Sequence, residues 1–152
     1  MDATITLIVK IIAANHRARF DYEILETVEA GMLLTGAEVK SCREGHVDMR
    51  GAYVSCMGSK PMLQKMSIAP YRYASDPAYN PLRPRELLLH AEERERLASR
   101  AQEKGMTIVP LEVRSGKFIK ILLGVARGRK RIDKRQRIRE RETQRRLRQG
   151  NL

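Results

Sequence analysis

The last 26 residues of the chain concentrate its positive charge. From Arg127 to Leu152 there are 12 Lys and Arg side chains against three Asp and Glu, a net charge of +9. The preceding 126 residues carry 18 basic and 15 acidic side chains, a net charge of only +3. Closely spaced cations bind a polyanion by neutralising its phosphates and releasing its counterions. The chemistry that the sequence offers first is therefore ionic binding, with nucleic acid as the first partner to consider.

The sequence offers no catalytic constellation. It lacks the glycine-rich phosphate loops GxGxxG and GxxxxGK[ST] and the nucleophile elbow GxSxG. The run Glu92–Glu95 predicts the solvated face of a helix, and the three histidines are too scattered to predict a metal site. Cys42 and Cys56 lack a CxxC pattern, which favours two reduced thiols of a cytosolic protein. We expect a protein that is not an enzyme, with no cofactor and no metal.

Residue patterns in the first 126 positions predict mostly strands with a few helices. A chain of this length predicts one domain of roughly 120 residues plus an appendage. The expected strands are 20–34, which should bend near Ala30–Gly31, and 52–57, 62–68, 107–113 and 118–123. The expected helices are 35–45 and 87–104. An irregular loop is expected over 70–84. Blocks of strands without alternating helices predict a small closed or partly open β-barrel of the OB type.

The chain divides into three parts on these patterns. Residues 1–14 predict an N-terminal arm or strand, 15–126 the barrel, and 127–152 the basic tail. The apolar stretch Thr4–Ala14 has no basic segment before it and is too short to span a bilayer. We therefore expect a soluble, cytoplasmic protein.

The basic tail predicts a helix that needs a partner. Residues 134–149 contain no Gly or Pro and are rich in strong helix formers. Ile132, Ile138 and Leu147 form no continuous apolar face, so the helix has little to pack on within its own protein. We expect the tail to be disordered alone and helical along RNA phosphates. A merely solubilising tail and a membrane-surface helix are the alternatives.

Several short segments together carry a family resemblance. They are Asn15-His-Arg-Ala-Arg19 leading into Asp21-Tyr22, Glu29-Ala-Gly31, Gly36-Ala-Glu-Val-Lys-Ser41, Arg83-Pro-Arg-Glu-Leu-Leu-Leu-His90, Lys104-Gly105, Gly124-Val-Ala-Arg-Gly-Arg-Lys130 and Asp133-Lys-Arg135. In this order and spacing they resemble the SsrA-binding protein family of bacterial trans-translation. The resemblance implies an oblong OB-like barrel with flanking helices, followed by a tail that is unstructured in solution. The implied partner is transfer-messenger RNA, which is carried to stalled ribosomes.

The resemblance also implies which barrel residues contact that RNA. Asn15, Glu29, Leu88 and Lys120 match positions on the surface that meets the tRNA-like part of transfer-messenger RNA. A carboxylate such as that of Glu29 can accept hydrogen bonds from base amino or ribose hydroxyl groups. For the segment Glu38–Lys40 the resemblance leaves a choice between packing and RNA contact.

In the tail, the resemblance implies contacts with the ribosome. The matching residues are Arg127, Arg129, Lys130, Ile132, Asp133, Lys134 and Arg135. Their implied role is to occupy the vacant mRNA channel next to the decoding centre, where ribosomal RNA supplies the counter-charge. Family members often carry His or Tyr where this chain has Ile132, which can contact a base but has no aromatic ring.

Taken together, these features predict a monomeric RNA-binding adaptor of trans-translation with no membrane association. The alternative is a structural ribosomal protein whose tail permanently threads ribosomal RNA. Such a protein would sediment stoichiometrically with all ribosomes, whereas an adaptor would be enriched on stalled ones. An RNA-modifying or RNA-cleaving enzyme is a third possibility, which turnover of bound RNA would reveal.

Overall fold

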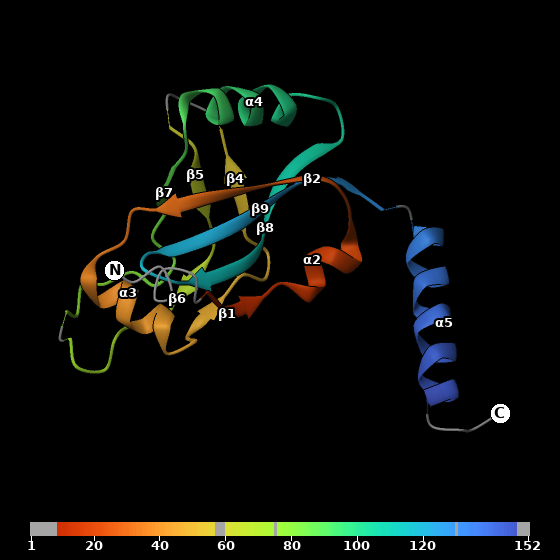
Figure 1. Cartoon of the computed structure of the whole chain (residues 1–152), viewed down its shortest axis with the longest axis horizontal. Helices are drawn as coiled ribbons and strands as arrows, with labels where there is room; N and C mark the ends of the chain where they lie inside the picture. Colours follow the sequence, from red (N-terminus) through yellow and green to blue (C-terminus); the bar gives the residue numbers. More distant parts are fainter. Residues whose placement is uncertain (1–8, 57–59, 75, 130, 149–152) are drawn as a thin grey trace, which may run out of the picture.

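The structure is a computed structural model that describes residues 9–56, 60–74, 76–129 and 131–148, with the side chains of 131–134 outside this description. Its elements in chain order are β1 (Lys10–Ala14), α2 (His16–Asp21), β2 (Tyr22–Met32), α3 (Gly36–Arg43), β3 (Val47–Asp48), β4 (Tyr53–Ser55), β5 (Met62–Gln64), β6 (Ser67–Ile68), β7 (Arg85–Leu88), α4 (Ala91–Ala101), β8 (Met106–Ser115), β9 (Ile119–Gly128) and α5 (Arg131–Arg148). The mostly-β fold with flanking helices is confirmed (Figure 1).

One antiparallel sheet forms the body. Its strand order is β1-β8-β9-β2-β7-β5-β4, and β3 and β6 form a separate two-stranded ladder. The sheet curls until β4, at one end of the order, lies beside β8, with no ladder between these two strands in the described part of the chain. The result is a partly open barrel, with α3 and α4 at its periphery (Figure 1).

Apolar side chains pack on both faces of this sheet. The larger cluster fills the barrel with the inward residues of the long strands, among them Ala30, Ile121 and Leu123. A smaller cluster lies on the outer face, where Ala18 of α2 packs against Leu111 and neighbouring residues. Helix α2 therefore covers part of the outer face and leaves the rest to solvent.

Helix α3 starts where its sequence predicts. The Thr35 hydroxyl accepts a hydrogen bond from the Glu38 N–H at 3.1 Å, and Glu38 Oε1 accepts one from the Thr35 N–H at 3.0 Å. This reciprocal capping box satisfies two backbone donors that the helix itself leaves unpaired. Beyond the helix, Gly45 adopts a φ of 84°, which favours glycine. The short helix expected over 35–45 is confirmed.

The helix expected over 87–104 is wrong in its first turn. Residues Arg85–Leu88 form β7, which pairs with β2 and β5, and α4 begins only at Ala91. Within β7, Arg85 and Leu87 are buried while Leu88 is exposed, an alternation with the period of a strand. Pairing with two neighbouring strands therefore overrides the helix propensity of the leucine run.

The long strand expected over 20–34 is shorter and irregular at a different place. Phe20 belongs to α2, a helix that the sequence analysis did not predict, and β2 begins at Tyr22. The irregularity is a register shift against β9 between Ile24 and Glu26, and the ladder continues regularly through Ala30–Gly31.

The strands expected over 107–113 and 118–123 are confirmed as β8 and β9, which pair with each other. The strand expected over 52–57 is confirmed as β4 within its described residues, and it pairs with β5. The single strand expected over 62–68 is wrong in its second half: the chain turns at Lys65, which has a φ of 61°, and Ser67–Ile68 forms β6 and pairs with β3 instead.

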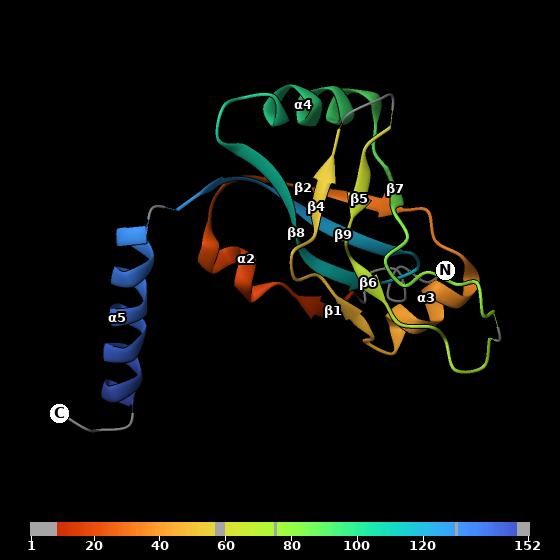
Figure 2. The ribbon, with the colours of Figure 1, turned by 180° about the vertical axis from the view of Figure 1, so that it is seen from behind.

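The C-terminal helix projects away from the barrel. Strand β9 continues to Gly128, so Arg127 still belongs to the sheet, and α5 then lies at the opposite end of the molecule from α3 (Figure 2). The helical state of the tail is confirmed, and its dependence on RNA stays a prediction. Among the described helices, none combines the length and apolar character that crossing a membrane requires.

Gly124 makes the outer cluster sensitive to one added methyl group. A Cβ at this position would lie 2.9 Å from Leu111 Cδ1 and 3.2 Å from Ile24 Cγ2, and Leu111 is fully buried. Overpacking typically costs about 1–3 kcal/mol, more than the roughly 0.5–1 kcal/mol that replacing Gly by Ala gains within a strand. Gly124→Ala should therefore lower the free energy of unfolding in urea titrations. Gly128→Ala, whose Cβ would meet open space, is the control and should not lower it.

Candidate RNA interface

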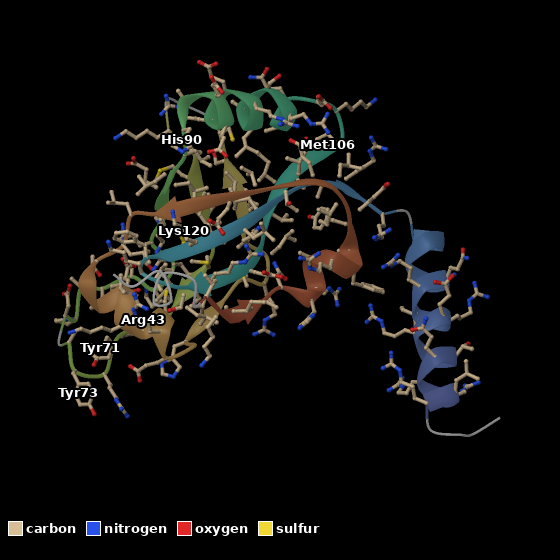
Figure 3. All side chains as sticks on the ribbon, viewed as in Figure 1. Arg43, Tyr71, Tyr73, His90, Met106 and Lys120 are labelled. Carbon is tan, nitrogen blue, oxygen red and sulfur yellow. The ribbon has the colours of Figure 1, made fainter. Side chains whose placement is uncertain are left out.

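Three of the four predicted barrel residues share the outer face of the sheet. Gly31 of β2 lies directly opposite Lys120 of β9 on one side and Leu88 of β7 on the other. Directly opposed residues of antiparallel strands project to the same face. Leu88 is 49% exposed, and Lys120, labelled in Figure 3, is half-buried. A Cβ at Gly31 would lie 3.4 Å from Leu88 Cβ, so this glycine lets the Leu88 side chain lie close to the backbone of β2.

Glu29 lies on the same face and takes part in an ion-pair chain. Its carboxylate is 3.2 Å from the guanidinium of Arg114, which also bonds the carboxylate of Glu112 at 3.0 Å. Glu29 remains 47% exposed, so it can still reach a partner. Arg114, which the sequence analysis did not single out, lies opposite Lys120 in the β8–β9 ladder. The face therefore combines two cations, two carboxylates and one apolar side chain, which we define as the sheet face.

Asn15 is placed differently from the other three. It is buried, caps α2 by accepting a hydrogen bond from the Ala18 N–H at 3.1 Å, and donates to the Pro110 carbonyl at 2.8 Å. These bonds hold α2 against β8 at the bulge that follows Pro110. The contacts give Asn15 a positioning role, and its direct contact with RNA stays a prediction.

The first two predicted tail residues belong to the edge of the barrel. Arg127 lies in β9 opposite Glu23 of β2 and Met106 of β8, and it is exposed. The Arg129 N–H donates to the Asp21 carbonyl at 3.0 Å, which fastens the chain to the end of α2. The backbone of Arg127 and Arg129 is therefore fixed by hydrogen bonds to the body of the protein.

Helix α5 exposes every side chain that the structure describes, from Arg135 to Arg148. This part of the helix carries seven arginines and two glutamates. The Arg141 guanidinium of this helix lies 5.3 Å from the centre of the Phe20 ring of α2. Of the other predicted tail residues, Lys130 and the side chains of Ile132, Asp133 and Lys134 lie outside the described part of the chain.

Glu38 proves to be the centre of a buried ionic network. The Arg85 guanidinium donates to Glu38 Oε2 at 2.6 and 3.1 Å, and Arg83 donates to Oε1. Arg85 also donates to the Met66 and Pro81 carbonyls, at 2.6 and 2.9 Å. Glu38 is 1% exposed and Arg85 is fully buried. The resemblance left open whether Glu38 packs inside the protein or contacts RNA, and the structure shows that its side chain packs.

The network keeps Glu38 ionised. Burial by itself would raise the pKa of this carboxyl, but hydrogen bonds from the Thr35 N–H, Arg83 and Arg85 outweigh it and lower the pKa to about 2.

Burial raises the pKa of the Cys42 thiol to about 12 and also raises that of Cys56. Both cysteines are free, and these shifts favour the unreactive thiol form.

A signal for Arg85 was present in the sequence. In a strand, Arg85 and the apolar Leu87 must face the same side, so an inward Leu87 implies a buried arginine and therefore a buried acid to pair with it. Because the sequence analysis predicted a helix from residue 87, it did not predict a buried Arg85 or its acidic partner.

In the described part of the chain, no group of three or more His, Cys, Asp or Glu side chains is placed to hold a metal ion.

The fold and its surfaces define a class of protein: a small antiparallel β-barrel with a basic helical extension. The model of the SmpB protein family matches residues 12–151 of this chain. The SsrA-binding protein of Coprothermobacter proteolyticus is 46% identical over 142 residues, covering 91% of this chain and 95% of that protein. The SsrA-binding protein of a Synechococcus strain is 48% identical over 141 residues, covering 91% and 92%. The chain belongs to the SmpB protein family.

A solved structure gives the same result in three dimensions. The structure described as "tmRNA-SmpB: a journey to the center of the bacterial ribosome" matches this one with a TM-score of 0.67 at 45% identity. The match covers 80% of this chain and 85% of that chain. The likeness therefore includes most of the barrel that carries the sheet face.

The Glu38 network should make the free energy of unfolding depend on pH in the acidic range. Because the pKa of Glu38 is lowered from its ordinary value of 4.5 to about 2 in the folded protein, the unfolded chain binds a proton first as the pH falls. The stabilisation is fully present above about pH 5 and is lost as the pH falls from there toward 2. Glu38→Gln should cost about 3–5 kcal/mol at neutral pH, because it leaves Arg85 buried beside an uncharged partner.

Urea titrations at pH 7 and pH 3 measure both effects through the free energy of unfolding. The difference between the two pH values should be smaller in Glu38→Gln than in the unmodified protein. Glu92→Gln, at an exposed position of α4, is the control and should leave both values unchanged. An equal pH dependence in the protein with and without Glu38 would show that this carboxyl does not carry the effect.

Proposed function

We propose that this chain is an RNA-binding adaptor of trans-translation. It binds the tRNA-like part of transfer-messenger RNA with its sheet face, brings that RNA to stalled ribosomes, and places its C-terminal helix in the vacant mRNA channel. The observation that carries the proposal is the separation of two unlike surfaces: a compact face of mixed charge on the sheet, and an exposed arginine-rich helix at one end of the molecule. The solved neighbour that joins tmRNA and SmpB in its description supports the same assignment.

The sheet face suits a folded RNA better than a bare phosphate backbone. Lys120 and Arg114 can each bind a phosphate, whereas Glu29 can accept hydrogen bonds from a base amino group or a ribose 2′-hydroxyl. Leu88, 49% exposed between charged neighbours, can pack on a base or sugar. Alternating charges fix the orientation of a partner, because any other docking brings like charges together. This combination favours one RNA shape over polyanions in general.

Helix α5 suits a groove lined by ribosomal RNA. Its described arginines lie on two opposite sides of the helix, so phosphates on both walls of a groove can neutralise them. Asp133, Lys134 and Arg135 match the family, and Ile132 would contact a decoding-centre base through apolar packing alone. In this role the protein acts in the cytoplasm, as a monomer, by binding rather than by catalysis.

Removing the helix should separate the two functions. Deletion of 131–152 leaves β9 and the sheet face intact, so the affinity for the tRNA-like part of transfer-messenger RNA should fall only slightly in gel-shift titrations. Tagging of nascent chains on ribosomes stalled without a stop codon should be lost in a reconstituted translation assay. The matched control deletes only 149–152, which carry no charged side chain, and should keep both activities. A tagging rate that survives deletion of 131–152 would exclude the role proposed for the helix.

Changing the sheet face should give the opposite result. Hydrogen bonds to charged groups contribute about 1.5–3 kcal/mol each, so Glu29→Ala combined with Lys120→Ala should weaken binding to the same RNA by roughly ten-fold or more. Both residues project from the outer face, so the melting temperature should change little. The matched control is Glu92→Ala with Lys104→Ala, an exposed acid and base at the α4 end of the barrel. Equal losses in the two double variants would mean that net charge, and not the sheet face, governs binding.

A further inference from the structure

A pocket at the end of the barrel distant from α5 takes no part in the function proposed above. It has a volume of about 210 Å³ and is lined by residues from the start of α3 and from 69–74 and 76–79. Its aromatic and acidic walls come from Tyr71, Tyr79, Glu38 and Asp76. Small side chains complete it, namely Thr35, Ala37, Ala69, Pro70 and Ala74. The pocket is smaller than the roughly 300–1,000 Å³ of sites that hold drug-sized ligands, so its occupant is a group the size of one ring system.

The buried network holds two walls of this pocket, Tyr79 and Glu38. The Tyr79 hydroxyl lies 2.8 Å from the Ile68 carbonyl and 3.0 Å from the Arg85 guanidinium, and Glu38 is fixed by Arg83 and Arg85. A pocket whose lining is fixed in advance loses little side-chain entropy when it is filled. Tyr79 is therefore fixed beside Glu38, although 76–79 forms neither helix nor strand.

Two cations and a second aromatic ring lie beside the Tyr71 wall of this pocket. The Lys40 ammonium lies 5.6 Å from the centre of the Tyr71 ring, and the Arg72 guanidinium lies 4.7 Å from that of Tyr73. The two tyrosine rings meet edge to face with their centres 5.4 Å apart, and Tyr73 is 73% exposed. Figure 3 shows both rings at the tip of the loop, beyond α3 and well apart from Lys120.

The net positive charge around the pocket favours an uncharged ring that is joined to phosphate groups on both sides. Arg83 and Arg85 neutralise Glu38 and leave one positive charge, and Lys40 and Arg72 add two more against the single carboxylate of Asp76. The cations beside Tyr71 and Tyr73 can hold phosphates while the pocket takes the ring that joins them. Asp76 adds a carboxylate that can accept a hydrogen bond from an exocyclic amino group.

We propose that this pocket binds one unstacked base of a single-stranded RNA segment. The base stacks on Tyr71, and Lys40 and Arg72 contact the phosphates on either side of it. This loop site is a third RNA contact, separate from the sheet face and from α5. The loop site depends on the proposed function only because it requires that the chain binds RNA. It adds a preference for bases that carry an amino group.

A fluorescent base tests the loop site directly. The probe is an unstructured six-nucleotide RNA with one 2-aminopurine, titrated with the full-length protein at high salt, where contacts to the arginine-rich helix are screened. Stacking on Tyr71 should quench the probe. Because stacking of a base on an aromatic side chain contributes about 1–3 kcal/mol, Tyr71→Ala should weaken the quenching affinity by roughly 5- to 150-fold, and Tyr71→Phe should preserve it.

Two controls keep the result specific. Tyr53→Ala removes another exposed tyrosine with a lysine nearby, Lys65 at 6.0 Å, on β4, and should leave the quenching unchanged. Thermal melting verifies that each variant folds. Unchanged quenching in Tyr71→Ala, or an equal loss in Tyr53→Ala, would overturn the loop site. Binding of transfer-messenger RNA by the sheet face is measured separately, so either proposal can fail while the other holds.

Discussion

The buried pairing of Glu38 with Arg85 is the constraint on which one end of the molecule depends. A buried charge is tolerated only when it is paired and hydrogen-bonded, and here one carboxylate meets a guanidinium that also holds the Met66 and Pro81 carbonyls. The pair joins α3 to β7 and, through those carbonyls, to a long loop that would otherwise have few reasons to keep one shape. The pocket beside α3 exists because the ionic bonds behind its wall are satisfied.

The two surfaces that we propose bind RNA differ in how their charges are arranged. On the sheet face Glu29 and Glu112 already pair with Arg114, so little net charge remains and recognition depends on geometry. On α5 the described arginines greatly outnumber the glutamates, so binding depends on the density of phosphate nearby and falls with salt. A protein that must choose one RNA and then enter a groove walled by another needs both kinds of surface.

Local signals in the sequence predicted local structure well, and long-range pairing decided the rest. The capping box at Thr35 is complete within four residues, so α3 could be predicted. Leu88 looked helical because the strands that make it part of β7 lie far away in sequence. The site shows the same limit: an outward lysine such as Lys120 resembles any other until the register places it opposite Gly31, and only family resemblance singled it out. Arg114 lacked even that signal.

Strand β9 sets the spacing between the sheet face and the start of the C-terminal helix. It carries Lys120 near its start and Arg127 near its end, and both sit in ladders with β2 and β8 along its length. At about 3.3 Å per residue, seven residues place these positions roughly 23 Å apart on a rigid support. The backbone bond from Arg129 to Asp21 then fixes where the chain leaves the barrel. In the proposed function, one strand therefore holds the RNA at the sheet face and the groove around α5 at a fixed spacing. This spacing requires the basic segment to start inside the fold, at Arg127 of β9.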